Sequence, residues 1–250
     1  MFTHLHFHTS YSFLDGYNSV KKAVARIKEL GMTACAITDH NNLGGCPEFQ
    51  EECEAQGIKP ILGVEGYFTP NMKEAGKPID ERKADALQKA IKAGAIDELS
   101  AKKLKKSEIT DLVKPYMYDM HQYHILFLAK NQQGWQNLVK MQSEAARLCT
   151  YNGRSLCDMD LVREYHEGII CTTACIGSYP AKCVEKGAYD EAEAYIVSMK
   201  NIFAEDFYLE IQPLNIDKQH NTNLFYMEMA EKHGIQVVAT NDVHYTRKED

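Results

Sequence analysis

Short apolar runs alternate with longer amphipathic stretches along most of the chain. Helical spacing occurs near residues 18–30, 47–56, 132–147, 188–203 and 218–233. The apolar runs between them have the length and composition of strands and lie at residues 4–8, 33–38, 59–65, 123–129, 168–173, 207–212 and 235–240. This order favours an α/β fold with a parallel sheet, and the number of strands favours a closed or nearly closed barrel. A doubly wound open sheet is the alternative, although no Gly-x-Gly-x-x-Gly motif follows the first strand to indicate a dinucleotide site.

Residues 71–117 interrupt this alternation. The segment is rich in Ala, Lys, Glu and Asp at helical spacing, so we expect a helical insertion within one domain that spans residues 1–250. Its run KKLKK, at residues 102–106, could contact a phosphate backbone, but the exposed face of a solvated helix explains it more simply.

Composition narrows the class of protein. With 250 residues and 44% hydrophobic content, the chain can bury a full core. Its apolar runs are far shorter than the roughly 20 residues of a membrane-spanning helix and no signal-peptide pattern opens it, so we expect a cytoplasmic protein. The eight cysteines include no Cys-x-x-Cys pair, and we expect most of them to be reduced. The net charge of −7 argues against a domain that holds nucleic acid by a basic surface of its own, so DNA binding would need help from neighbouring domains.

Ionisable side chains concentrate where the predicted strands end. In a barrel of parallel strands, those ends and the loops that follow them form the active site. Taken alone, each side chain has a plain structural explanation, such as a turn cap or an ion pair. Together they do not, because burying so many unpaired ionisable groups is costly unless cations compensate for them. The side chains are His6, His8, Asp15, Asp39, His40, Glu65, Cys175, Asp242 and His244.

The pattern therefore predicts a metal site. Histidines combined with carboxylates and one thiolate suit Zn²⁺, Mn²⁺ or Fe²⁺ better than Mg²⁺ or Ca²⁺. A bridging carboxylate such as Glu65 would hold two ions about 3.5–4 Å apart, the spacing that serves phosphoester hydrolysis. The chemistry indicated is attack of a metal-activated hydroxide on phosphorus.

Six blocks of the sequence resemble a known family. In combination they are similar to the PHP (polymerase and histidinol phosphatase) domain at the N-terminus of bacterial C-family replicative DNA polymerases, of the DNA polymerase III α type. The likeness covers the chain apart from residues 71–117. The blocks are HLHFHTSYSFLDG, AITDHNNLGG, KPILGVEGYF, YHILFLAKNQQGWQNL, TTACIGS and VVATNDVHYTRKED.

The resemblance implies a distorted (β/α)7 barrel, similar to a TIM barrel, with two to three divalent metal ions at the C-terminal ends of its strands. His4 matches no ligand of the family, so we expect it to have a supporting or structural role. We expect Asp39, beside His40, either to support a ligand or to cap a turn, and not to bind metal directly. Among the implied ligands, only His124 stands at the start of a predicted strand. Carried over position by position, the ligands are His6, His8, Asp15, His40, Glu65, His124, Cys175, Asp242 and His244.

Three hypotheses about function follow from the resemblance. The leading one is a metal-dependent phosphoesterase that acts as a 3′→5′ proofreading exonuclease on the primer end of DNA, helped by the rest of the polymerase and with other replisome subunits as candidate partners. The second is a phosphatase of small substrates, similar to histidinol-phosphate phosphatase, with Arg154 or Lys182 as candidate phosphate-binding residues. The third is a non-catalytic module that docks a separate proofreading subunit.

Overall fold

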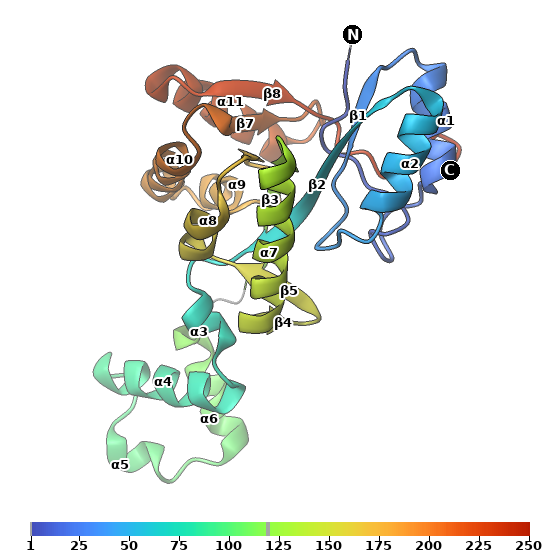
Figure 1. Ribbon diagram of the computed structural model, residues 1–250. Coiled ribbons are helices and arrows are strands. Elements are labelled where there is room, and N and C mark those ends of the chain that lie inside the picture. Colours follow the sequence, from blue (N-terminus) through green and yellow to red (C-terminus); the bar gives the residue numbers. More distant parts are fainter. Residues whose placement is uncertain (1, 119–120) are drawn as a thin grey trace.

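The computed structural model describes residues 2–118 and 121–250. Its strands form one mixed sheet, with helices packed around it (Figure 1). Six of the seven predicted strands are present, and an additional hairpin, β4–β5, joins the sheet. The strands are β1 Ala34–Ile37, β2 Lys59–Phe68, β3 Tyr123–Ala129, β4 Thr150–Tyr151, β5 Arg154–Cys157, β6 Ile169–Thr172, β7 Phe207–Ile211 and β8 Gln236–Ala239.

The five predicted helices are also present, and two shorter α-helices and a 3-10 helix join them. Their ends follow local signals: α2 and α11 each stop at a glycine with positive φ, Gly57 and Gly234. The side chain of Asn131 caps the start of α7 by accepting from the amide of Gly134 at 2.9 Å. The helices outside residues 71–117 are α1 Val20–Glu29, α2 Cys46–Gln56, α7 Gln132–Leu148, α8 Met159–Tyr165, α9 Tyr179–Glu185, α10 Tyr189–Phe203, the short 3-10 helix η2 Ala204–Asp206 and α11 Asp217–His233.

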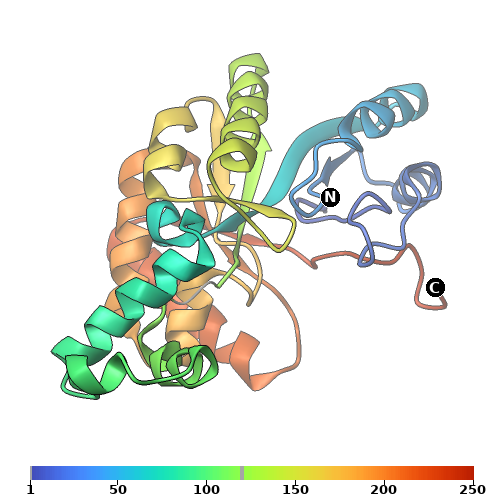
Figure 2. The ribbon, with the colours of Figure 1, turned by 90° about the horizontal axis from the view of Figure 1, so that it is seen from below.

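Backbone hydrogen bonds close the barrel where the two ends of the chain meet. Residues 4–8 lie between β1 and the chain that follows β8. The amide of Ala36 donates to the carbonyl of His4, and the amide of His8 donates to the carbonyl of Val243, both at 2.8 Å. Figure 2 shows the C-terminal segment crossing to the side of the molecule that carries the N-terminus. The chain therefore has the predicted distorted α/β barrel.

The first predicted strand, residues 4–8, is not a regular strand. Only Phe7 forms a bridge, with Val243. Against β1, the amides of Ala36 and Thr38 donate to the carbonyls of His4 and Phe7. An advance of three positions in the N-terminal segment therefore matches an advance of only two positions in β1. The hydroxyl of Thr38 accepts from the displaced amide of Phe7 at 2.8 Å. This bulge-like step explains why the regular ladder is lost.

The expectation of an all-parallel sheet is wrong at β3. This strand is antiparallel to β2 and to β6, while β1–β2, β6–β7 and β7–β8 are parallel. A reversed strand presents its N-terminal end where its neighbours present their C-terminal ends. The start of β3 therefore lies at the end of the barrel where the other strands finish.

The hairpin β4–β5 was not among the predicted elements. Its turn residues Asn152 and Gly153 both have positive φ, +50° and +76°, which is typical of a two-residue turn joining antiparallel strands. β5 then pairs in parallel with the end of β2, where Tyr67 faces Leu156. The dipeptide Asn-Gly is the signal that identifies such a turn from sequence.

Residues 72–116 form helices that extend away from the barrel (Figure 1). The side chain of Asn71 caps the first of them by accepting from the amide of Glu74. A hydroxyl–hydroxyl contact of 2.9 Å between Thr69 and Tyr118 ties the two ends of this excursion together. The helices are α3 Met72–Gly76, α4 Ile79–Lys92, α5 Glu98–Ala101, α6 Lys106–Val113 and the 3-10 helix η1 Lys114–Tyr116.

Two further sequence expectations concern the chain as a whole. All eight cysteines are free thiols, as expected. None of the helices in residues 2–118 and 121–250 is both long and apolar enough to cross a membrane.

Helix α7 approaches the loop before β6 so closely that only glycine fits at Gly134. A Cβ there would lie 1.7 Å from the carbonyl oxygen of Gly168. We expect Gly134→Ala to lower the free energy of unfolding by about 1–3 kcal/mol, the usual cost of overpacking, measured by urea denaturation of the metal-free chain. Gln136→Ala, at an exposed position of the same helix, is the control and should unfold at the wild-type urea concentration. Equal midpoints for the two variants would contradict this account.

Candidate metal centre

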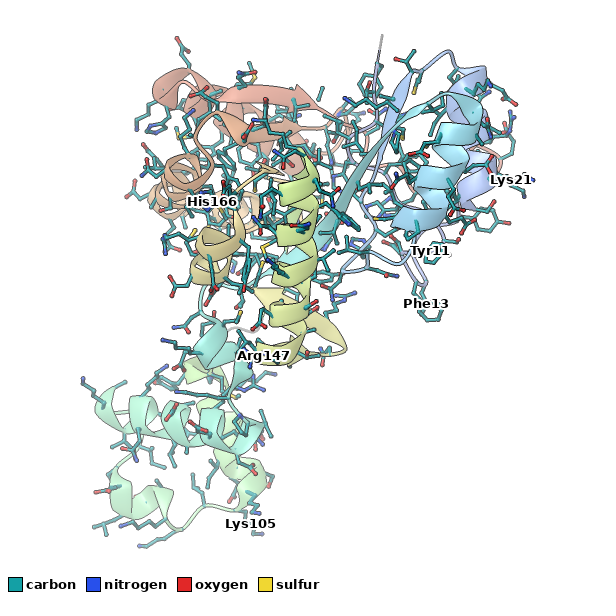
Figure 3. The ribbon with its side chains drawn as sticks, viewed as in Figure 1. Tyr11, Phe13, Lys21, Lys105, Arg147 and His166 are labelled. Atoms are coloured by element: carbon teal, nitrogen blue, oxygen red, sulfur yellow. The ribbon has the colours of Figure 1, made fainter. Side chains whose placement is uncertain are left out.

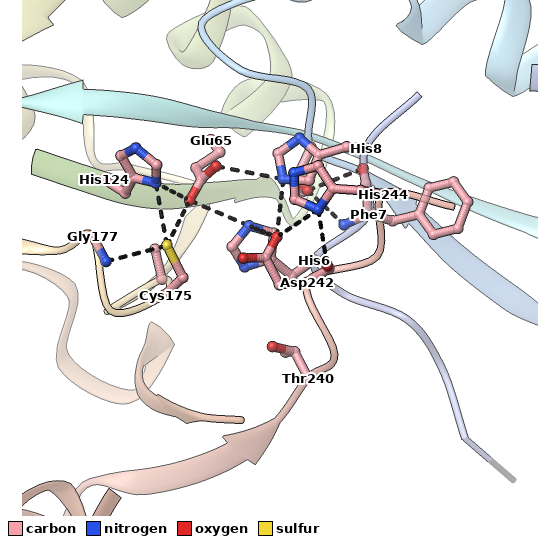
Figure 4. Close-up of polar contacts among 12 residues, drawn as sticks. His6, Phe7, His8, Glu65, His124, Cys175, Gly177, Thr240, Asp242 and His244 are labelled. Atoms are coloured by element: carbon pink, nitrogen blue, oxygen red, sulfur yellow. Dashed lines mark hydrogen bonds and ion pairs between the residues drawn. The ribbon is translucent and has the colours of Figure 1, made fainter. Parts of the chain in front are cut away.

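Side chains from segments far apart in the sequence meet at one end of the barrel (Figure 4). His6 and His8 share one face of the N-terminal segment, because alternate residues of an extended chain point the same way. Glu65 comes from β2, whereas Asp242 and His244 follow β8. The barrel therefore brings its first and last segments to the same place.

Glu65 is the centre of this cluster, and its side chain is 1% exposed. Oε1 lies 2.9 Å from Nδ1 of His124 and 3.3 Å from Nε2 of His6. Oε2 lies 2.8 Å from Nδ1 of His40 and 3.4 Å from Nε2 of His8. Burial alone would raise the pKa of Glu65, but the surrounding imidazoles, His124 first, hold it well below its usual value. The carboxylate is therefore ionised and has imidazoles on both of its oxygens.

Two aspartates extend the cluster. Oδ1 of Asp242 lies 3.2 Å from Nε2 of His6 and 3.3 Å from Nε2 of His8. Oδ2 of Asp15 lies 2.8 Å from Nε2 of His40 and 3.1 Å from Nε2 of His244. Burial opposes ionisation of both aspartates, yet the neighbouring imidazoles lower the pKa of each. Asp242 is largely buried whereas Asp15 is half-exposed, so the two carboxylates mark the inner and outer sides of the cluster.

Several buried polar atoms of the cluster have no hydrogen-bond partner among the described residues. An unsatisfied buried donor or acceptor costs about 1–3 kcal/mol. Here the atoms converge on one another, as the distances above show, so one kind of bound cation would satisfy them together. The donor set therefore fits divalent metal ions. The atoms are Nε2 of His6, Nε2 of His8, Nδ1 of His40, Oε2 of Glu65 and Oδ1 of Asp242.

Three overlapping groups have the spacing of metal ligands. Within each group the ligand atoms lie within 4.8 Å of one another. His8, His40 and Glu65 each belong to two of the groups, so the groups adjoin one another. They are His8–His40–His244, His6–His8–Glu65 and His40–Glu65–His124.

Cys175 lies at the edge of the cluster. Its Sγ is 3.2 Å from Nδ1 of His124 and 3.6 Å from Oε1 of Glu65, and the amide of Gly177 donates to it at 3.4 Å. Burial, and then the charge of Glu65, raise the pKa of the thiol well above its usual value. A cation next to the sulfur would favour the thiolate instead, which is the form that binds metals.

The orientation of His6 is fixed from behind by Glu210, a residue that the sequence reasoning missed. Oε1 of Glu210 lies 2.7 Å from Nδ1 of His6, while the hydroxyls of Thr172 and Thr240 donate to the same carboxylate. Nδ1 of His6 therefore carries the proton, and Nε2 is left to face the cluster. Such a carboxylate behind an imidazole is common at metal sites. The run FYLEIQ offered a signal, because Glu210 is the charged residue of a buried strand.

Asp39 holds the loop of residues 9–12 in place through hydrogen bonds, and through this loop it orients His8. It accepts from the amide of Thr9 at 2.6 Å, from the hydroxyl of Thr9 at 2.7 Å and from the hydroxyl of Ser12 at 2.7 Å. Because Ser12 donates its proton to Asp39, its oxygen accepts from Nδ1 of His8 at 2.8 Å. Nε2 of His8 is therefore also free to face the cluster.

The fold, the cluster and the sequence agree with one family. A family model described as the PHP domain matches residues 4–213. The chain belongs to the PHP domain family. Curated relatives of this PHP domain include the DNA polymerase III subunit alpha of Aquifex aeolicus, 32% identical over 249 residues, and that of Borreliella burgdorferi, 33% identical over 249 residues. Each alignment covers 100% of the PHP domain, which spans about a fifth of the relatives' length, 19% and 18% respectively.

A solved structure supports the fold of the PHP domain independently. An amidohydrolase from Chromobacterium violaceum superposes with a TM-score of 0.53 at 14% sequence identity, over 97% of this chain and 87% of that one. At this level of identity, the likeness is one of fold alone.

The structure of this PHP domain places all nine sequence-derived ligand candidates in contact with at least one other member of the set. His124, the candidate at the start of its strand, joins them because β3 is antiparallel to its neighbours. His4 does not belong to any of the three groups, and its ring packs edge-on against Phe2. Lys182 forms an ion pair with Glu185 in α9. The nine are His6, His8, Asp15, His40, Glu65, His124, Cys175, Asp242 and His244.

The support of His6 by Glu210 can be tested with Glu210→Gln. The new amide group would place a donor where the carboxylate now accepts from the hydroxyls of Thr172 and Thr240, so the support of His6 would be lost. We therefore expect the affinity for Zn²⁺ or Mn²⁺ to fall about tenfold to a hundredfold. Metal titration by calorimetry measures the affinity. Glu228→Gln, on the exposed side of α11, is the matched control and should bind as the wild type does. Unchanged affinity in Glu210→Gln would rule out this supporting role.

The affinity for metal should depend on pH in a direction set by the histidines. Burial alone would lower the pKa values of His6 and His40, but neighbouring carboxylates raise both, that of His6 well above its usual value. Without metal, these protonated rings stabilise the fold fully below the ordinary histidine pKa, and that contribution is lost as pH rises through the raised values. Metal binding must displace the same protons, so it should tighten from about pH 6 to about pH 8. Titrations in buffers of different ionisation enthalpy count the protons released, and an affinity that is flat over this range would contradict the prediction.

Proposed function

We propose that this PHP domain is a metal-dependent phosphoesterase that acts, within the α subunit of a bacterial replicative DNA polymerase, on the 3′ end of DNA. The observation that carries the proposal is the convergence of unpaired buried ligand atoms on Glu65 and Asp242. The match of the whole chain to about a fifth of the length of DNA polymerase III alpha subunits supports the polymerase context.

The donor set supports two to three ions of Zn²⁺, Mn²⁺ or Fe²⁺. Imidazoles dominate it, with carboxylates and one thiol, and such ligands suit these ions better than Mg²⁺ or Ca²⁺. Glu65 belongs to two of the three ligand groups and has two carboxylate oxygens, so it could contribute an oxygen to each of two ions. When bound, the ions would supply a hydroxide at neutral pH and stabilise the charge of the departing oxygen.

A pocket of about 730 Å³ gives a substrate access to the cluster. Asp15, His40 and His124 line it, together with Arg154. The guanidinium of Arg154 lies 4.6 Å from the centre of the Tyr67 ring, and its Nη1 donates to Oε1 of Gln122 at 2.8 Å. Guanidinium groups match the geometry of phosphate oxygens, so Arg154 is positioned to hold the phosphate group of a substrate.

The same pocket suits a second candidate function, a phosphatase of small substrates. Arg154 lines the pocket, as that hypothesis requires, whereas Lys182 is paired with Glu185 in α9. Comparing the turnover of a simple phosphomonoester with that of single-stranded DNA separates the two functions. The net charge of −7 favours help from other polymerase domains when the substrate is DNA.

The proposal predicts a metal-dependent shortening of DNA. Purified chain loaded with Mn²⁺ or Zn²⁺ should remove nucleotides from a 3′-mismatched primer, followed on a denaturing gel. His8→Ala should abolish this activity, because it removes a ligand shared by two of the three groups. His220→Ala, at an exposed position of α11, should retain it and is the matched control.

Three results would contradict the proposal. Equal activity in His8→Ala would identify a contaminating nuclease. Turnover of phosphomonoesters without any effect on DNA would favour the small-substrate phosphatase. Fewer than one bound ion per chain, after controlled loading, would favour a non-catalytic docking module.

A further inference from the structure

The loop between residues 11 and 15 exposes two large apolar side chains beside the metal centre. Phe13 is 84% exposed and Leu14 is 93% exposed, the highest fractions among the large hydrophobic side chains of the described residues. Figure 3 shows Phe13 projecting from the end of this loop, beyond Tyr11. Such exposure is unfavourable in water unless something covers the side chains when the protein works.

This loop is held in place on both sides of Phe13. The amides of Asp15 and Gly16 donate to the carbonyl of Ser12 at 3.0 and 2.9 Å, and the hydroxyl of Ser12 donates to Asp39. Leu14 adopts a φ of +65°, which is uncommon for a residue with a branched side chain. A Cβ on Gly16 would lie 1.9 Å from the carbonyl oxygen of Thr9, so the end of the turn packs directly against the backbone at Thr9. The exposed ring therefore has a defined position relative to Asp15.

The hairpin β4–β5 lines the same pocket. Asn152, Gly153 and Arg154 of the hairpin belong to its lining, as do Phe13 and Leu14 of the loop. The lining therefore combines an exposed aromatic ring and a guanidinium with the candidate metal ligands Asp15, His40 and His124. Phe13 and Asp15 are two positions apart in the chain, with Leu14 between them, so their Cα atoms lie within about 7 Å of each other. That reach is comparable to the separation of a base from its own phosphate within one nucleotide.

We propose that Phe13 is the platform on which the base of the 3′-terminal nucleotide stacks, while Arg154 holds the adjoining phosphate. The inference rests on the proposed phosphoesterase function and specifies its substrate as an unpaired nucleotide terminus. An exposed ring can receive a base only if that base has left the duplex stack, so paired ends must fray before they bind. Stacking accepts every base, because each one has a π-face, and this suits an enzyme that removes any mismatched nucleotide.

The test is a binding cycle that separates the base from the phosphate. The experiment uses two fluorescein-labelled single-stranded oligonucleotides that carry phosphorothioate linkages at the 3′ end. One ends in a normal nucleotide and the other in an abasic site. Each is titrated with Zn²⁺-loaded chain, and binding is followed by fluorescence anisotropy. The wild type should bind the base-bearing oligonucleotide about fivefold to a hundredfold more tightly. Phe13→Ala should abolish this difference, and Phe13→Trp should restore it. Leu99→Ala, which truncates an exposed apolar side chain in α5, should keep the wild-type difference.

The outcomes distinguish the inference from the function on which it rests. If Phe13→Ala weakens both oligonucleotides equally, or neither, the ring does not stack on the base and covers another surface, such as a neighbouring domain. If the wild type shows no preference for the base yet shortens the mismatched primer, the stacking platform is refuted and the phosphoesterase stands. If the wild type hydrolyses no DNA at all, the proposed function itself fails.

Discussion

The buried carboxylate of Glu65 is the constraint on which the rest of the site depends. Removing an ionised carboxylate from water is costly, and attraction to partners repays that cost only when the geometry is good. Four imidazoles approach its two oxygens, and they come from residues 6, 8, 40 and 124 of the chain. No local segment could bring these four together. The closed ring of strands therefore brings together the imidazoles that offset the cost of burying this carboxylate. The unpaired imidazole nitrogens around it are the atoms that a metal ion would bind.

The reversed strand β3 completes this arrangement. Its register places His124 opposite Tyr67, two residues beyond Glu65, at the end of the barrel where the parallel strands finish. The amide of His124 donates to the carbonyl of Gly177 at 3.1 Å, and a Cβ on Gly177 would lie 3.0 Å from Nδ1 of the same ring. Glycine at this position lets the loop after β6 approach the ring closely enough to place Cys175 beside it. One antiparallel strand therefore supplies one candidate ligand, His124, and helps to position a second, Cys175.

Much of this could be predicted from the sequence, because alternate residues on a strand share a face and strand ends carry the chemistry. His6 with His8, and Asp242 with His244, are such pairs. The direction of β3 could not be predicted, since its apolar run reads the same for a parallel or an antiparallel strand. The support from Glu210 was equally hidden, because its partners Thr172 and Thr240 are distant in sequence. The hairpin at Asn152 and Gly153 is different: its turn signal was present, and the hairpin was nevertheless missed.

The two sides of the cluster differ in burial, and under the proposed function this difference would separate the holding of ions from the contact with a substrate. On the inner side, His6 and His8 are fully buried. Nδ1 of His6 is hydrogen-bonded to Glu210, and Nδ1 of His8 is hydrogen-bonded to Ser12. On the outer side Asp15 is half-exposed and faces the pocket. Buried side chains that are held by hydrogen-bond partners keep their positions when a substrate arrives. An exposed side chain can change its contacts without leaving a buried charge unpaired. Under the proposed function, a phosphate group would therefore enter from the side of Asp15, through the pocket that Phe13 and Arg154 also line.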